Sequence, residues 1–428
     1  MFDYGIMRLD LDFYGRKVMN MSKLKVRIYP ALSGDCFLIS MGQVHQKHIL
    51  IDGGYPDTYK DYLKKDLEEI SSRGERLDLL VVSHIDQDHV GGVISFLEDN
   101  NKNNRITINE VWHNSFRHLD LNKKTKTPIS DKEKTYLEGV IRKGLYLKHP
   151  IHKGGSHIVD ISATEGSTLA SLISKGKYPW NTDFNGKAID CDKYHKIDKG
   201  SYKLWILSPN TESLNRLGKW WLNELKKKSE DFVIGNEAVF EDAFECAQLN
   251  DFDIGVTSRD ISSSEKALTD EMMKKVIEKN DEVDKKITNL SSIAFILEYD
   301  EKYLMFLGDS NPDIVAESLR KLKENKHLDI ELFNLVKISH HGSKKNINNA
   351  LASQIASKIY VFSTNGEYGH PDLETLARII YFNNNIEKNC IFNYLSAASN
   401  LSIDEALGKR YKIFNTVSDG DHTVTIEL

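Results

Sequence analysis

One short segment constrains the fold of this chain more than any other. Four potential metal ligands, His84, Asp86, Asp88 and His89, lie within six residues and follow closely on the apolar run Leu79–Val82. The apolar run predicts a buried strand, and a loop at a strand end can direct several side chains at one point. Imidazole and carboxylate ligands suit zinc, manganese or iron. The segment predicts an open catalytic metal site; an ordinary polar surface loop explains it less well.

The surrounding sequence predicts a mixture of strands and helices. Gly91 and Gly92 are expected to turn the backbone sharply, before Val93–Leu97 continues as a helix packed back on the strand. Upstream, the alternation of apolar and polar residues predicts three opening strands, at 23–29, 36–40 and 48–52, and helical spacing follows over 59–73. This mixture of strands and helices is expected of two sheets flanked by helices.

The spacing of the four ligands resembles the His-x-Asp-x-Asp-His variant of the signature of metallo-β-lactamase-fold hydrolases. Four further segments follow in that family's order: Ile49–Gly54, Leu304–Asp309, Val336–Ser343 and Asn365–Pro371. The last two resemble one branch in particular, the metallo-hydrolase domain of the DNA-uptake channel protein ComEC. The resemblance covers most of residues 23–210 and 289–428. It implies an α/β fold, the αββα sandwich of two mixed β-sheets flanked by helices.

The expected domain organisation interrupts this fold once. Between Pro209 and Asn289 the sequence becomes charged and helix-favouring, with Trp220-Trp221 and the stretch 265–286 as examples. We expect an N-terminal extension at 1–20, the first part of the fold at 21–209, an α-helical insertion at 210–288 and the second part at 289–428. The insertion could be a lid, a dimerisation arm or a partner surface, but the paired tryptophans need burial, so a simple packing role is favoured.

The resemblance implies two divalent metal ions, zinc or manganese. His84 and Asp86 would hold one ion and Asp88 and His89 the second, with Asp309 bridging them. Such a pair lowers the pKa of a shared water enough to supply hydroxide near neutral pH, and it neutralises phosphoryl charge. Asp86, in place of the commoner second histidine, adds a hard oxygen and is expected to favour manganese without excluding zinc.

Further site residues are predicted with more than one role. His340 and His341 follow a strand, in which adjacent side chains point to opposite sides, so only one of the two is expected to be a ligand. His370 is predicted to be a ligand or the proton donor to the leaving group, and with Asp88 it forms the predicted catalytic pair. Asp52 is expected to orient a ligand histidine.

Residues at the rim of the expected site have weaker assignments. His113, in Val111–Asn114, could complete the metal shell or face the substrate, and core packing or a loop contact is equally consistent with its position. Asn114 and Tyr368 are grouped with it as outer or substrate-contacting residues. Ser343 and Asn365 are predicted to donate hydrogen bonds to phosphate oxygens, although turn stabilisation explains them as well.

Composition limits the classes of protein to which the chain can belong. Its 428 residues, 40% hydrophobic and 28% charged, can bury a core of more than one layer. No apolar stretch reaches the roughly eighteen residues of a membrane span and no leader pattern is present, so a cytoplasmic, free-standing protein is expected. The four cysteines, at 36, 191, 246 and 390, are expected to be thiols.

The leading functional hypothesis is a phosphodiesterase or nuclease that acts on DNA or RNA. The net charge of −6 gives no general attraction to nucleic acid, and the basic runs Lys123–Lys126 and Lys226–Lys228 are typical of solvated faces. One alternative is hydrolysis of a nucleotide or another small phosphoester. Another is an effector subunit of a phage-defence or competence assembly, gated by a protein partner bound to the insertion.

Overall fold

The computed structural model describes residues 23–121, 129–147, 168–229, 232, 234–235, 237–250, 268–279, 282–399, 405–420 and 422–428. The predicted extension at 1–20 and the basic run Lys123–Lys126 lie outside these residues.

The first sheet has six strands and contains the three predicted opening strands. Its spatial order is β14-β1-β2-β3-β4-β5, and it is antiparallel from β14 to β3 and parallel from β3 to β5. The strands are β1 (Leu24–Ile28), β2 (Phe37–Met41), β3 (Lys47–Ile51), β4 (Leu79–Val81), β5 (Val111–Trp112) and β14 (Val424–Glu427).

The second sheet has eight strands in the order β13-β12-β11-β10-β9-β8-β7-β6. It is antiparallel from β6 to β9 and parallel from β9 to β13. The strands are β6 (Lys196–Asp198), β7 (Lys203–Ser208), β8 (Ala294–Tyr299), β9 (Lys302–Phe306), β10 (Leu335–Lys337), β11 (Ile359–Phe362), β12 (Lys388–Phe392) and β13 (Ile413–Val417).

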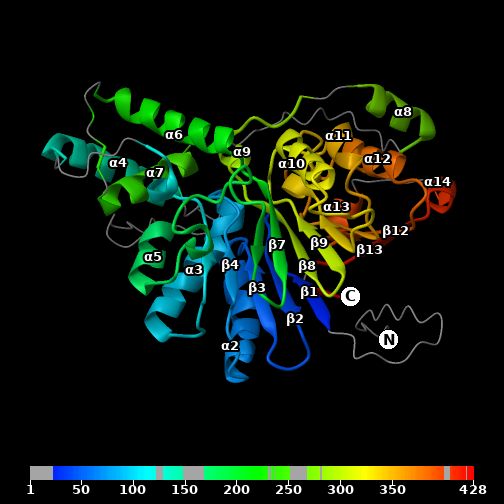
Figure 1. Ribbon diagram of the computed structural model, residues 1–428, viewed down its shortest axis with the longest axis horizontal. Helices are drawn as coiled ribbons and strands as arrows, with labels where there is room; N and C mark the ends of the chain where they lie inside the picture. Colours follow the sequence, from blue (N-terminus) through cyan, green and yellow to red (C-terminus); the bar gives the residue numbers. More distant parts are fainter. Residues whose placement is uncertain are drawn as a thin grey trace, which may run out of the picture.

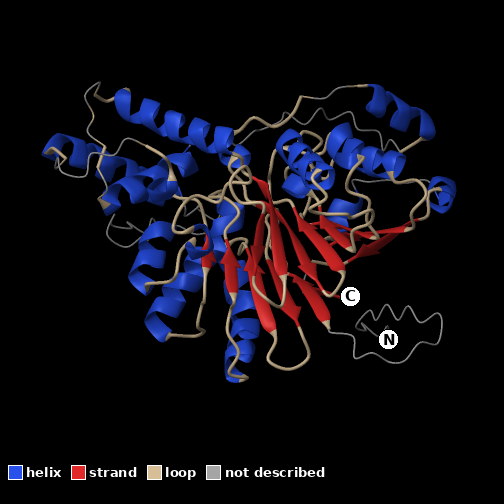
Figure 2. Ribbon diagram, in the orientation of Figure 1, coloured by secondary structure: helices blue, strands red, loops and turns tan. Residues whose placement is uncertain are grey.

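The two sheets pack face to face, and helices cover their outer sides (Figures 1 and 2). Side chains from both sheets share one central core, in which Phe37 of β2 and Phe306 of β9 meet edge to face with ring centroids 5.8 Å apart. Two outer cores join the sheets to the helices. The helices are α2 (Lys64–Ser72), α3 (Gln87–Asn103) and α5 (Leu169–Gly176) on the first sheet, and α10 (Pro312–Glu324), α11 (Asn349–Ala352) and α12 (Leu373–Phe382) on the second. This arrangement confirms the predicted αββα sandwich.

The prediction for the glycine pair was wrong. Helix α3 begins at Gln87, so Gly91 and Gly92 lie inside the helix and make no turn before it. A Cβ atom on Gly92 would lie 2.0 Å from the carbonyl oxygen of Gly53. The pair therefore allows α3 to approach the loop after β3, which brings the metal-ligand motif close to Asp52.

Most helices of the expected insertion gather with an earlier helix in a separate lobe. Helices α4 (Asp131–Leu147), α6 (Thr211–Lys226) and α7 (Ala238–Asn250) share a core in which Trp221 is fully buried. Helix α8 (Asp270–Glu278) instead packs on the far side of the molecule, beside α12 (Figure 1). The chain returns to the second sheet through α9 (Ile287–Leu290).

Short elements complete the fold: α1 (Pro56–Thr58), the π-helical turn Tyr59–Leu63, the 3₁₀ turns Phe116–His118, Thr182–Phe184 and Ser339–Gly342, and α13 (Leu395–Ser399) and α14 (Glu405–Arg410). The four cysteines are buried free thiols, as expected. Among the described residues, no helix combines the length and the apolar character needed to cross a membrane.

Candidate metal centre

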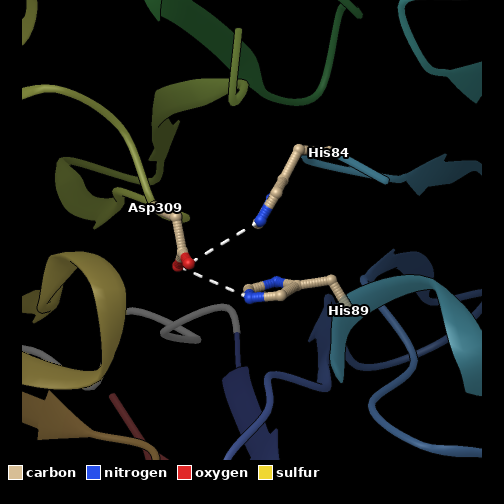
Figure 3. Close-up of side chains that lie close together, drawn as sticks. All are labelled: His84, His89 and Asp309. Atoms are coloured by element: carbon tan, nitrogen blue, oxygen red, sulfur yellow. Dashed lines mark ion pairs between the residues drawn. The ribbon is translucent and has the colours of Figure 1, made fainter. Parts of the chain in front are cut away.

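Strands from both sheets end at one place and deliver the predicted ligands to it. His84 to His89 follow β4 of the first sheet, Asp309 follows β9 of the second, and His340 and His341 follow β10. Figure 3 shows His84 and His89 pointing toward Asp309 from the opposite side of the centre. The carboxyl ends of parallel strands form a common edge, which explains why ligands far apart in sequence converge.

The two carboxylate oxygens of Asp309 face two different groups of side chains. Asp309 Oδ2 lies 3.7 Å from His84 Nε2 and 3.6 Å from His340 Nε2, and Asp86 Oδ2 lies 3.6 Å from His84 Nε2. We call the group His84, Asp86 and His340 site one. It corresponds to the pairing of His84 with Asp86 expected from the resemblance, with His340 added.

The other oxygen, Asp309 Oδ1, lies 3.4 Å from His89 Nε2 and 4.0 Å from His341 Nε2. Asp88 Oδ2 lies 3.3 Å from His341 Nε2 and 3.8 Å from His89 Nε2. We call the group Asp88, His89 and His341 site two. Its atoms lie close enough together for all three to reach a single ion.

The donor atoms of this centre fit divalent cations. Ligands about 2.1 Å from a tetrahedral zinc ion lie roughly 3.4 Å from one another. The separations given above, from 3.3 to 4.0 Å, are on this scale. The atoms that converge most closely are those of site two and those of His84, His89 and Asp309. His84 Nε2, His89 Nε2, His341 Nε2 and Asp309 Oδ1 are all buried and have no hydrogen-bond partner. Buried polar atoms without partners are costly in free energy, and a cation bound between them would satisfy them.

Each ligand histidine is held by a partner at its other ring nitrogen. Ser83 Oγ lies 3.0 Å from His84 Nδ1, and Asp52 Oδ2 lies 2.9 Å from His89 Nδ1. The carbonyl oxygen of Ser363 accepts from His341 Nδ1 at 2.8 Å, and Asn346 Oδ1 lies 3.0 Å from His340 Nδ1. These contacts favour protons on Nδ1 and leave each Nε2 lone pair available to a metal.

Asp52 has the orienting geometry that the sequence predicts for it. It lies directly after β3 with φ of +54°, and besides His89 it accepts hydrogen bonds from the Ser83 amide and hydroxyl groups, both at 2.7 Å. Asp52 therefore connects the ends of β3 and β4 while it fixes the His89 ring.

The expectation that only one of His340 and His341 faces the site was wrong. Strand β10 ends at Lys337, and both histidines have left-handed backbone conformations, with φ of 46° and 55°. Alternation of side chains applies only to extended backbone, so the premise fails here. The tight turn directs one imidazole to each site.

Further charged side chains support the centre from behind and at its outer edge. The buried side chains of Asp35 and Lys337 form an ion pair, and Asp35 Oδ1 lies 3.6 Å from His341 Nδ1. At the outer edge, Lys286 Nζ lies 2.6 Å from Asp86 Oδ2, and Asp284 Oδ2 lies 3.3 Å from His340 Nδ1. Both outer residues belong to the turn that precedes α9.

The ionisation of the centre favours cation binding. Burial raises the pKa of the Asp86 carboxyl, but Lys286 and His84 outweigh burial and hold this pKa well below its ordinary value. Burial also opposes ionisation of Asp309, yet His340, His89 and His341 together keep its pKa far below the usual range. Burial lowers the pKa of His340, whereas Asp309 and Asp284 raise it to about 9. The carboxylates are thus ionised, and bound cations would displace the imidazole protons.

His370 lies beside site one. Its ring centroid is 5.6 Å from that of His340, and its Nδ1 lies 3.3 Å from Asp372 Oδ2. Burial lowers the pKa of His370, and Asp372 only partly opposes this effect. The structure therefore places His370 at the border of the centre, with a carboxylate that can orient its ring.

His113 and Asn114 lie in a different environment. His113 is buried, stacks on Trp180 at 6.2 Å and has its Nε2 3.5 Å from Glu245 Oε1 of α7. Asn114 exchanges hydrogen bonds with the backbone of Ile189. Among the described residues, the groups of converging ligand atoms do not include His113. His113 therefore contacts the helical lobe and Asn114 the loop of Ile189, while both ring nitrogens of His113 are buried without a hydrogen-bond partner in the described part of the chain.

The remaining predicted residues lie around the histidine turn. Ser343 is buried, and its amide donates to the carbonyl oxygen of His340 at 2.8 Å. Asn365 caps its own turn by accepting from the Glu367 amide at 3.0 Å. Tyr368 is 45% exposed, and the nearby Asp88 contributes to raising its pKa after burial and Glu367. Ser343 and Asn365 stabilise turns in this structure, and Tyr368 borders the centre.

Sequence reasoning missed the outer supports Asp35, Lys337, Asp284, Lys286 and Asp372. Lys337 lies within the recognised segment Val336–Ser343 and Asp372 directly follows Asn365–Pro371, so their positions were a usable signal. Asp284 and Lys286 lie in the charged segment at the end of the insertion, where a single sequence offers nothing to distinguish them from solvated charges.

One family model matches part of the chain. Residues 29–166 match the family model of the metallo-beta-lactamase superfamily. Its members are mostly metal-dependent hydrolases, and the matched segment contains Asp52 and the motif His84 to His89.

The other comparisons add no functional assignment. No curated protein matches the chain. Among solved structures, a mutant of the CmlA beta-hydroxylase is similar with a TM-score of 0.33 and 10% sequence identity, over 96% of this chain and 54% of that one. The chain therefore spans about half the length of that protein.

Proposed function

We propose that this protein is a metal-dependent phosphodiesterase, with nuclease action on DNA or RNA as its leading activity. The observation that carries the proposal is the position of Asp309, which presents one carboxylate oxygen to each of two groups of ligands. Two divalent cations held there would activate water near neutral pH and neutralise charge on a phosphoryl group. Zinc and manganese both suit the mixed imidazole and carboxylate ligands.

The residues of the chain contribute positioning and charge to this chemistry. Asp52 and Ser363 hold the rings of His89 and His341, so that site two is fixed before a substrate binds. Lys286, whose side chain is 28% exposed, places a positive charge at the edge of site one, where it favours an anionic substrate over a neutral one.

His370 is the proposed proton donor to the leaving group. Its ring lies next to His340 and is oriented by Asp372. A donor must hold its proton near the reacting oxygen, and the neutral imidazole can donate from only one nitrogen. The contact with Asp372 favours a proton on Nδ1. His370 therefore acts in its protonated form, with Nε2–H directed to the substrate.

The preference for nucleic acid rests on the resemblance of the two histidine motifs to the ComEC domain, which is an analogy at the level of family. Hydrolysis of a nucleotide or another small phosphoester is the second candidate, favoured by the net charge of −6. An effector role gated by a protein partner is the third, because two outer supports of site one belong to the expected insertion.

One experiment tests the activity and separates these candidates. The purified protein and its Asp88→Ala variant are analysed for bound metal and incubated with labelled linear, circular and single-stranded DNA, RNA and a chromogenic phosphodiester, with manganese or zinc. Cleavage of nucleic acid by the parent alone supports the nuclease. Hydrolysis of only the small ester supports the second candidate. A parent that binds metal and cleaves none of these contradicts an autonomous phosphodiesterase.

A further inference from the structure

Site one differs from site two in being completed by residues from outside the two sheets. The turn Asp284–Lys286 lies where the chain returns from α8 to α9, and it contacts two of the three side chains of site one. Asp284 Oδ2 lies 3.3 Å from His340 Nδ1, and Lys286 Nζ lies 2.6 Å from Asp86 Oδ2. The two residues carry opposite charges, so their effects on a bound cation must differ in sign.

The turn is anchored to α9, to the start of α10 and to the loop that follows the histidine turn. The Asp284 amide donates to the carbonyl oxygen of Lys345 at 3.0 Å, and Asn311 at the start of α10 donates to the carbonyl oxygen of Asp284 at 2.7 Å. Asn289 and Asn346 both donate to Asp284 Oδ2, at 2.7 and 3.1 Å. Inside the turn, the Lys286 amide donates to Asp284 Oδ1 at 2.9 Å. The carboxylate of Asp284 and the backbone of Lys286 are therefore held in place.

Asp284 acts in favour of a cation in site one. A carboxylate at Nδ1 orients the imidazole and makes Nε2 a stronger electron-pair donor, and losing such an outer partner weakens metal binding. Asn346 shares this position, so it retains some of the orientation when the charge of Asp284 is removed.

Lys286 acts against cation binding in site one. Its ammonium group binds the same Asp86 oxygen that lies 3.6 Å from His84 Nε2. A lysine there both competes for the carboxylate and repels a divalent cation. The 28% exposure of its side chain also leaves room for the ammonium group to move away.

We propose that the turn Asp284–Lys286 sets the affinity of site one, with Asp284 strengthening it and Lys286 weakening it, so that site one is the readily exchanged metal position and site two the retained one. The inference rests on the metal centre of the proposed function, but it concerns metal affinity and is independent of the substrate. It also gives the expected insertion a chemical role, because the turn that ends it decides how easily site one is filled.

The test measures binding of manganese to the metal-free full-length protein by titration calorimetry, with elemental analysis of the loaded protein. The variants are Lys286→Met and Asp284→Asn, and Lys285→Met is the matched control because Lys285 is exposed between them. The binding event of site one is the one that Asp86→Ala removes. We expect Lys286→Met to tighten this event at least about tenfold, because a nearby unit charge is lost. We expect Asp284→Asn to weaken it about 10- to 100-fold.

The expected gain of affinity in Lys286→Met separates the inference from misfolding, which weakens binding. Weaker binding in this variant, or affinities equal to those of Lys285→Met in both variants, would overturn the proposal. A parent that binds one manganese ion and gains a second after Lys286→Met would support it in its strongest form. A parent that binds no metal contradicts the proposed function itself, whereas two metals with unresponsive variants contradict only this inference.

Discussion

The two halves of the metal centre are built from different parts of the molecule. Site two is supported by Asp52, by the carbonyl oxygen of Ser363 and by the pair Asp35–Lys337, all from loops and strands of the two sheets. Site one shares Asp309 with it but depends on a turn beside α9. Its histidine ligand His340 has a 29% exposed side chain, whereas that of His341 is 5% exposed. The fold therefore fixes one position and leaves the other adjustable.

The largest effect is expected where the two halves meet. Replacing Asp309 with alanine removes the contact with both groups of ligands, so binding at both sites should fall by more than the roughly 100-fold cost of losing an outer partner. Phosphodiester hydrolysis should become undetectable. Manganese titration and turnover of a chromogenic ester measure these effects, with the exposed Asp313→Ala on α10 as control. If one site kept its full affinity for manganese in Asp309→Ala, Asp309 would not be a ligand common to both sites.

A variant of His370 tests whether this residue, at the border of site one, acts in catalysis without being a metal ligand. Replacing it with glutamine should lower kcat by about 10²- to 10⁴-fold, the usual contribution of a general acid, and leave two metals bound. Burial lowers the pKa of His370, so the parent should lose activity as pH rises through a value below that of a free histidine. This loss of activity with rising pH should be absent in the His370→Gln variant. Loss of one metal ion would instead identify His370 as a ligand.

A variant of Asp52 tests the support of site two. In Asp52→Asn the partner of His89 Nδ1 loses its charge, and site two should bind manganese about 10- to 100-fold more weakly while site one is unchanged. Asp190→Asn is a suitable control, because Asp190 is equally buried and accepts hydrogen bonds from Thr211 and Asp192 instead. Equal weakening of both sites would show that the halves are coupled through the backbone.

The last prediction concerns the buried lysine Lys388, which lies outside the metal centre and should affect stability but not metal binding. Burial lowers the pKa of Lys388 to about 8, and its Nζ donates only to the carbonyl oxygens of Ile386 and Tyr411 among the described hydrogen bonds. The unfolded chain then binds more protons than the folded one between pH 8 and the ordinary lysine value of 10.5. This group should raise the free energy of unfolding with pH in that window, by up to about 3 kcal/mol.

Urea unfolding of the parent and of Lys388→Met across this window measures the effect. The difference between the two curves isolates the lysine from the tyrosines and cysteines that also titrate there. The parent should gain stability relative to the variant as pH rises, and a constant difference would mean that the lysine is solvated.

The sequence predicts the parts of this molecule whose spacing reflects local geometry. Alternation identified the opening strands, and the motif from His84 to His89 contains four of the seven side chains that form the centre. The glycine pair and the two adjacent histidines were misjudged for one reason: their conformations depend on contacts made after folding. Gly92 meets the loop of Gly53, and His340 lies in a left-handed turn. Lys286 reaches Asp86 across 200 residues, which no local pattern reports.

The pairing of β1 with β14 gives this protein a particular order of assembly. Val424 lies opposite Ile28, a separation of roughly 400 residues, and contacts so distant in sequence form slowly. During synthesis on the ribosome, β1 emerges long before the strand that covers its open side. The nascent first sheet, which already carries the motif from His84 to His89, therefore keeps one edge available to other extended chains until β14 has been synthesised.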